Sequence, residues 1–327
     1  MSTAWVAGTV RAKALARRRL GAAGARALAG SPTLGEALTV LAASPYGHDV
    51  RADQTLAEAQ HAVGATLLWH MRVLAGWVPR HGADVVRLLA AGFEVANVDE
   101  HVHRLGAGLD DSVEHGVEGG VGPGPGRHPS GTAFHLGALA TAWGRLGTTR
   151  SFADLRRVLR TSAWGDPGGE SAWAVHVGMR LAWAVRVERG VPSARPWAAG
   201  GAALLVARQM FLMGHELPTA TVDLAAPVLG RRFDGAGSLA DLAGRLPVDA
   251  RWALDEVADP ADLWQAEAAW WQRVQRDGLD LLRGSRFGPG PVVGALAVLG
   301  ADARRVGAAL EVAARAGAPL EAFDGVA

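Results

Sequence analysis

The chain has 327 residues, of which 49% are hydrophobic and 20% charged, and its 33 basic side chains nearly balance its 32 acidic ones. This composition is typical of a globular protein with ample material for a core, and a net charge of +1 argues against nucleic acid as a partner. The chain has no cysteine, which excludes disulfides, thiolate metal sites and cysteine nucleophiles. Its only lysine, Lys13, follows no glycine loop, so a lysine-containing phosphate-binding loop is excluded as well.

Apolar residues recur at helical spacing along nearly the whole chain, and the abundant alanine, leucine and arginine favour helices. The sequence therefore predicts an all-α protein. The predicted long helices cover, in chain order, residues 4–28, 52–78, 83–105, 132–146, 171–189, 196–214, 261–283 and 291–316.

Residues 106–131, between the third and fourth predicted helices, contain a run of glycine and proline that predicts a flexible loop. The longest apolar runs, 197–207 and 289–301, fall short of the ~20 residues that a membrane-spanning helix needs, so we expect no direct membrane span. The first residues lack a signal-peptide core, which predicts a cytoplasmic location.

A short pattern recurs along the chain. Residues 33–47 align without gaps on residues 151–165, and a less faithful third copy begins at residue 238. Each copy opens with a hydroxyl residue followed three positions later by an acid, which predicts a capped helix start in which each side chain binds a backbone N–H group. The three pairs are Thr33 with Glu36, Ser151 with Asp154, and Ser238 with Asp241. Because a tryptophan-bearing helix and a second long helix follow each copy, the sequence predicts three related units, approximately 1–130, 131–217 and 218–327.

Two segments carry a resemblance to a known family. Residues 93–98, Phe-Glu-Val-Ala-Asn-Val, resemble the aromatic–acid–x–x–Asn–aliphatic element of the C-subunit family of V/A-type ATP synthases (V-type ATPases), which is related to the d-subunit of the eukaryotic V-ATPase. Residues 289–319, with the acid–x–basic segment that begins at Asp302, resemble the last helix of that family and the Gly-x-Pro turn after it. The opening residues 10–20, leading into 41–46, are similar to the start of the family.

The sequence also departs from the family pattern. Arg305 stands at the position that matches Asn97, and Gly307 stands where a basic residue is expected. In the middle unit Gln209 occupies the matching position, and Val206 replaces the acid three residues before it.

The resemblance implies one domain over residues 1–327, with three helical units around a pseudo-threefold axis that form a funnel with a central socket. It further implies a non-catalytic central-stalk component of a V/A-type rotary ATPase. Such a protein links the membrane proteolipid ring to the central shaft, couples ATP hydrolysis or synthesis to ion transport, and sits in a peripheral complex on the inner face of the cell membrane. The alternative is a helical-repeat adaptor or regulatory protein that has kept the fold and lost the rotor contacts.

Six residues are candidates for an interface. Glu94 and Asn97 lie on one face of a predicted helix, where they either fix the packing of neighbouring helices or contact a partner protein. Arg17 and Arg18, in the basic stretch of residues 11–19, either form a solvated helix face or contact acidic loops of a partner or anionic lipid headgroups, and the same alternatives apply to Arg304 and Arg305.

Histidines raise the only enzymatic alternative. His101 and His103 lie near several carboxylates, but their i, i+2 spacing does not suit two ligands on one helix. We therefore expect no metal, no cofactor and no catalytic site, and we interpret the twelve tryptophans as packing residues.

Overall fold

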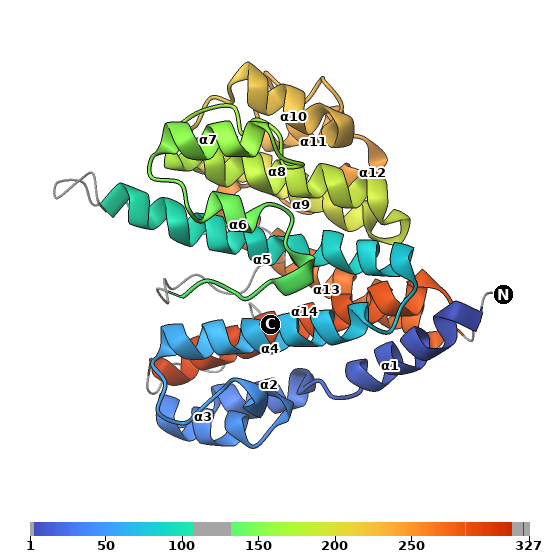
Figure 1. The fold of residues 1–327 in the computed structure, drawn as a ribbon. Coiled ribbons are helices and arrows are strands. Elements are labelled where there is room, and N and C mark those ends of the chain that lie inside the picture. Colours follow the sequence, from blue (N-terminus) through green and yellow to red (C-terminus); the bar gives the residue numbers. More distant parts are fainter. Residues whose placement is uncertain (1–2, 108–131, 285, 316–322, 324–327) are drawn as a thin grey trace. The chain divides into compact units, whose positions relative to one another are not determined.

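The computed structural model describes residues 3–107, 132–284, 286–315 and 323. All regular structure in these ranges is helical and none of it is strand, which confirms the predicted all-α class (Figure 1). The chain forms two compact units. One, here called the terminal unit, contains residues 1–93, 123–139 and 271–327, and the other, the central unit, contains residues 94–122 and 140–270. The three predicted repeat units stay a prediction.

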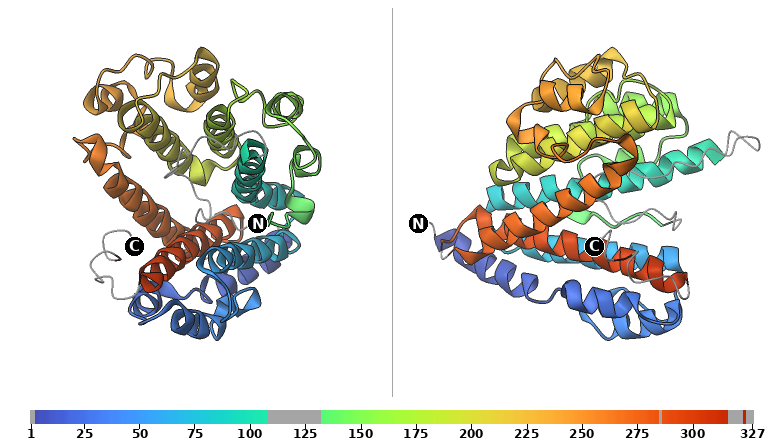
Figure 2. Two further views of the ribbon diagram at one scale, coloured as in Figure 1. Left: turned by 90° about the vertical axis from the view of Figure 1, so that its left-hand side faces the viewer. Right: turned by 180° about the vertical axis from the view of Figure 1, so that it is seen from behind.

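The terminal unit is built around α14, Pro289–Ala314, which packs against the first four α-helices of the chain. Figure 2 shows α14 in red beside α4 in light blue. Leu28, Leu38, Leu41 and Leu310 are fully buried in the hydrophobic core of this unit. The other elements of this unit are η1 Thr3–Trp5, α1 Val6–Ala16, α2 Gly21–Ala29, α3 Leu34–Ala42, η2 Pro45–His48, α4 Leu56–Ala75, the start of α5 Arg80–Ala107, η3 Gly137–Leu139 and the end of α13 Leu263–Arg283.

The central unit is built around α8, Ala172–Gly190, which packs against α9 and α10. Gly178 on α8 permits a close approach of the chain, because a Cβ there would lie 2.6 Å from the Pro167 backbone. The other elements of this unit are the rest of α5, α6 Trp143–Leu146, α7 Phe152–Arg160, η4 Pro192–Ala194, α9 Arg195–Ala207, the π-helical turn η5 Arg208–Leu212, α10 Thr219–Leu229, α11 Leu239–Arg245, α12 Val248–Arg251, η6 Pro260–Asp262 and the first part of α13.

Most of the long predicted helices are present within a few residues of their expected bounds, but two predictions are wrong. The helix expected over 4–28 is broken into α1 and α2, and α2 begins at Gly21, whose φ of +78° favours glycine. The helix expected over 132–146 is reduced to η3 and the short α6. In both places a distant carboxylate binds the non-helical backbone, as the next section describes. The sequence analysis also missed α10.

The repeated capping pattern forms helix starts in all three copies. Thr33 Oγ1 accepts a hydrogen bond from the Glu36 N–H at 3.2 Å, and the serines that begin the other two copies accept equivalent bonds at 3.1 and 3.2 Å. The return contact forms in part in the third copy, where Asp241 Oδ2 accepts the Gly237 N–H at 3.0 Å and also pairs with Arg245. In the second copy Asp154 pairs with Arg157. The complete reciprocal capping box occurs instead at Thr55 and Glu58.

The predicted loop over 106–131 begins later than expected, since α5 continues through Ala107, and its residues from 108 onward lie outside the described residues. No helix in the described part of the chain is both long and apolar enough to cross a bilayer.

Candidate functional site

A buried carboxylate of α14 organises the start of the terminal unit. Asp302 is 1% exposed. Its Oδ2 accepts a hydrogen bond from the Leu20 N–H at 2.9 Å, and its Oδ1 accepts one from the Gly21 N–H at 2.7 Å. The Tyr46 hydroxyl donates a third bond to Oδ2 at 2.9 Å. The negative charge therefore lies at the N-terminus of α2, where free N–H groups and the helix dipole favour an anion.

Arg305, one turn after Asp302, brings a buried positive charge into the same cluster. Its Nη2 donates to Gln275 Oε1 at 2.6 Å. Burial lowers the pKa of Arg305, and the charge of Asp302 opposes this shift. Burial, followed by the charge of Asp302 and its hydrogen bond, raises the pKa of Tyr46 well above its ordinary value. The four polar side chains thus compensate one another inside the fold.

Glu94 on α5 forms a matching cluster in the central unit. Its side chain is 0% exposed. Its Oε2 accepts a hydrogen bond from the Thr141 N–H at 2.5 Å, and its Oε1 accepts bonds from the Ala142 N–H at 2.7 Å and from Trp164 Nε1 at 2.8 Å. The Arg186 guanidinium lies 4.6 Å from the centre of the Trp164 ring. Burial lowers the pKa of Arg186, and the charge of Glu94 opposes this shift.

The two clusters share one design. In each, a carboxylate of a long helix accepts two consecutive backbone N–H groups and one aromatic side-chain donor, with an arginine nearby that is buried (Arg305) or half-buried (Arg186). The aromatic donors, Tyr46 and Trp164, are the residues that the predicted repeat places at equivalent positions. Each follows a serine by two residues, and Ser44 Oγ and Ser162 Oγ accept the backbone N–H of their aromatic residue at 3.1 Å in both cases.

A third position differs from these two. Gln209, which sequence reasoning placed at the position of Asn97 in the middle unit, accepts a hydrogen bond from Trp173 Nε1 at 2.5 Å. Its Oε1 also lies 3.0 Å from His215 Nδ1. A neutral amide therefore binds a tryptophan here, whereas a carboxylate binds one in the Glu94 cluster.

Burial favours the packing interpretation of the Glu94 and Asn97 pair. Asn97 is 1% exposed, and every hydrogen bond that Glu94 accepts in its cluster comes from its own unit. The pair therefore fixes internal packing, and direct contact of these two side chains with a partner protein would need the cluster to open. Their assignment to an interface stays a prediction.

The four candidate arginines have different environments. Arg17 and Arg18 are exposed directly after α1. Arg304 is half-buried, with its guanidinium 5.6 Å from the centre of the Trp271 ring. Arg305 is buried in the Asp302 cluster and is not a surface residue. Only Arg17 and Arg18 thus keep the character of a solvated basic surface.

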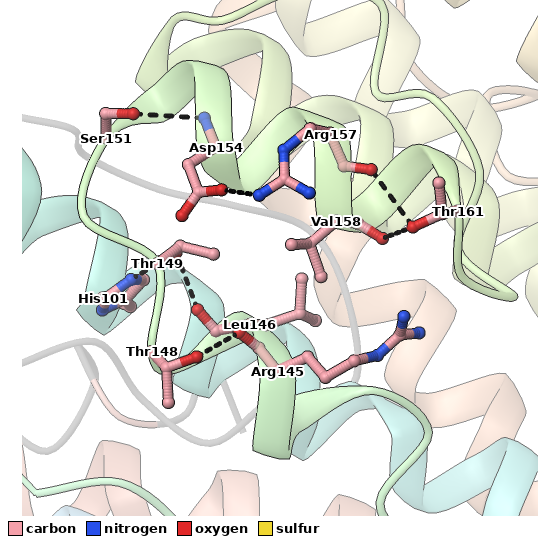
Figure 3. A network of polar contacts seen from close by, with 10 residues as sticks. All are labelled: His101, Arg145, Leu146, Thr148, Thr149, Ser151, Asp154, Arg157, Val158 and Thr161. Atoms are coloured by element: carbon pink, nitrogen blue, oxygen red, sulfur yellow. Dashed lines mark hydrogen bonds and ion pairs between the residues drawn. The ribbon is translucent and has the colours of Figure 1, made fainter.

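His101 is held by hydrogen bonds within the fold. His101 Nε2 lies 2.8 Å from Thr149 Oγ1, and that hydroxyl donates to the Leu146 carbonyl at 2.7 Å, so His101 Nε2 carries the proton (Figure 3). Burial, followed by the charge of Arg104, lowers the pKa of His101. His103 is exposed. In the ranges that the structure describes, no group of three or more histidine, aspartate or glutamate side chains is placed to hold a metal ion.

Sequence reasoning missed a polar cluster between α5 and α8. Arg180 donates to both carboxylate oxygens of Asp99, from Nη2 to Oδ2 at 2.7 Å and from Nη1 to Oδ1 at 3.1 Å. His176 Nδ1 lies 3.1 Å from the same Oδ1. Burial raises the pKa of Asp99. The charge of Arg180 and the hydrogen bonds from His176 and Arg180 outweigh this effect and hold the pKa well below its usual range. The i, i+4 spacing of His176 and Arg180 was the available signal.

Comparisons with known proteins give no family for the chain. No family model matches it, and no curated protein matches it either.

Proposed function

We propose that the chain is a non-catalytic central-stalk component of a V/A-type rotary ATPase, which links the membrane proteolipid ring to the central shaft. The support is the resemblance carried by residues 93–98 and 289–319, together with the position of the key acids of both segments. Glu94 and Asp302 occupy the same kind of buried cluster, one in each unit. A residue pattern shared with the family thus coincides with residues that organise the fold.

The role requires a stiff adaptor, because torque is transmitted only by a part that does not deform. Buried carboxylates that bind backbone N–H groups of distant segments stiffen a helical protein, since each breaks only at the cost of an unpaired buried charge. We propose that three such helical units surround a socket for the shaft, with the opposite face on the proteolipid ring. The partners would be the shaft proteins and the ring, in a peripheral complex at the inner face of the cell membrane.

A second candidate is an adaptor or regulatory protein that has kept this fold and lost the rotor contacts. The burial of Glu94, Asn97 and Arg305 favours it, because the residues that carry the resemblance serve internal packing and would persist without a rotor. The two candidates differ in their partners.

Affinity purification of the tagged full chain from gently solubilised membranes tests the proposal. We expect the catalytic, shaft and proteolipid proteins of a rotary ATPase to co-purify with it, whereas an untagged control strain yields none of them. Recovery of the chain without these proteins, from membranes in which other multi-protein complexes stay intact, would contradict the rotor role and favour the adaptor.

A further inference from the structure

The outer face of α1 combines apolar and cationic side chains. Its exposed residues follow helical spacing, with an apolar part at the start and basic residues at the end. This α1 outer face consists of Val6, Ala7, Val10 and Ala14, followed directly by Arg17 and Arg18. Val10 is 59% exposed and Val6 is 39% exposed. In Figure 1, α1 is the dark blue helix nearest the N label.

Two neighbouring segments extend this face on either side. The Arg11 guanidinium lies 5.7 Å from the centre of the Trp77 ring, and Trp77 is 52% exposed. On the other side Lys13 Nζ donates to the Gly284 carbonyl at 2.7 Å, and the exposed Phe287 follows three residues later. Exposed valine, tryptophan and phenylalanine thus accompany at least four cations.

The charge of this surface has one sign. Residues 1–35 contain six arginine and lysine side chains and no acid, and neither 59–83 nor 281–301 contains an acid. Of the acids that flank these segments, Asp84 and Asp280 pair with Arg87 and Arg283, Asp302 is buried, and Glu36 and Glu58 lie in the first turns of α3 and α4. A chain with a net charge of only +1 therefore concentrates positive charge beside its exposed apolar side chains.

We propose that the α1 outer face docks on an anionic lipid surface, with Val6, Val10 and Trp77 in the headgroup region and Arg17 and Arg18 on lipid phosphates. Tryptophan is enriched at the membrane–water interface, and basic side chains are attracted to anionic headgroups. The face is the convex side of one helix, which suits a deformable planar lipid surface better than a rigid protein pocket. The inference does not depend on the rotor role.

Sedimentation of the purified full chain with vesicles tests the charge requirement. We expect binding to vesicles that contain phosphatidylserine, weakened by salt, and no binding to pure phosphatidylcholine vesicles. The double variant R17Q/R18Q removes both charges. It should weaken binding about 25-fold, because each basic residue near the surface contributes roughly fivefold. The matched control neutralises the exposed pair Arg231 and Arg232 of the central unit and should bind as the wild type does.

Site-specific labelling tests which residues enter the lipid. The chain has no cysteine, so V10C carries a single thiol for an environment-sensitive dye. We expect its fluorescence to rise with phosphatidylserine vesicles, while the same dye on V40C stays unchanged, because Val40 is equally exposed, at 57%, on α3. Absence of vesicle binding, unchanged binding after the Arg17 and Arg18 substitutions, or equal signals from both labelled variants would overturn the proposal.

Discussion

The Tyr46 hydroxyl donates a 2.9 Å hydrogen bond to Asp302, which lies 256 residues further along the chain. The same carboxylate binds two backbone N–H groups at the start of α2. One acid of the last long helix therefore holds two separate segments of the N-terminal region. A contact between residues so far apart in the sequence is costly to form, because a long loop must close first. Once formed, it specifies which distant segments pack together.

The alkaline titration of Tyr46 should report this contact directly, since it is the only tyrosine in the chain. Its pKa is raised in the folded protein, so this group contributes stability at and below its ordinary pKa of 10.0, which is lost as the pH rises above that value. We expect tyrosinate absorbance to appear only well above pH 10.0, together with the loss of helical circular dichroism. A midpoint near the ordinary value with the helices intact would contradict the buried contact. In D302N the absorbance should appear at lower pH.

Glu94→Gln should destabilise the central unit. The amide keeps the size of the side chain but has a single acceptor oxygen, so its NH2 group faces either the N–H of Thr141 or the donors of Ala142 and Trp164. It also leaves the charge of Arg186 without its counter-charge. We expect a loss of ~3 kcal/mol in the free energy of unfolding, measured by chemical denaturation.

A matched control for this substitution is Glu216→Gln, because Glu216 is exposed in the same unit. It should change the free energy of unfolding by less than ~0.5 kcal/mol. Equal effects of the two substitutions would show that the buried carboxylate adds nothing beyond its volume.

The two clusters also explain where sequence reasoning succeeded and failed. The long helices and the capped starts at Thr33, Ser151 and Ser238 depend on local spacing, so the sequence was sufficient for them. The break before Gly21 and the bend at Thr141 depend on carboxylates far away in sequence. Apolar periodicity alone continued a helix through both places, because periodicity carries no information on which distant acid binds the backbone.

Only part of the candidate site was predicted, because local patterns do not show contacts between distant segments. The pairing of Tyr46 with Trp164 followed from a gapless alignment, and the importance of Glu94 followed from the resemblance. The match of Arg305 to Asn97 also aligns Asp302 with Glu94, but the groups that Asp302 binds depend on the packing of α14 on α2, which no local pattern supplies. Burial of Arg305 was missed because a basic side chain is usually solvated.

His70 on α4 should make the terminal unit sensitive to mild acid. Its side chain is 5% exposed, and its Nδ1 has no hydrogen-bond partner in the described structure. Burial, followed by the charges of Arg18, His48 and Arg11, lowers its pKa from 6.5 to about 4. The neutral form therefore contributes stability above pH 6.5, and this is lost as the pH falls towards 4.

His70→Leu removes this titration while keeping a buried side chain of similar size. We expect the variant to gain on the order of 2–3 kcal/mol relative to the wild type between pH 8 and pH 4, as measured by denaturation at each pH. The control His103→Gln alters an exposed histidine and should leave the pH dependence unchanged. A pH profile of His70→Leu parallel to the wild type would exclude a buried neutral histidine.

The Asp99 cluster should also lose stability in acid, but in a lower pH range than His70. The pKa of Asp99 is held well below its usual 3.8 by Arg180 and His176, so the ionised carboxylate contributes stability above that value. As the pH falls below 3.8 towards the lowered pKa, this contribution disappears. Asp99→Asn, which cannot ionise, should therefore be less stable than the wild type by ~2 kcal/mol near neutral pH, with a deficit that shrinks in acid.

The partner side of this contact separates the charge effect from packing. Arg180→Lys keeps the charge but loses the two parallel bonds to Asp99, so it should retain only part of the stability and most of its pH dependence. Arg180→Met keeps the packing of the stem and removes the charge, so its deficit should match that of Asp99→Asn and also shrink in acid. If Arg180→Met were as stable as the wild type at neutral pH, α5 and α8 would be joined by apolar packing alone.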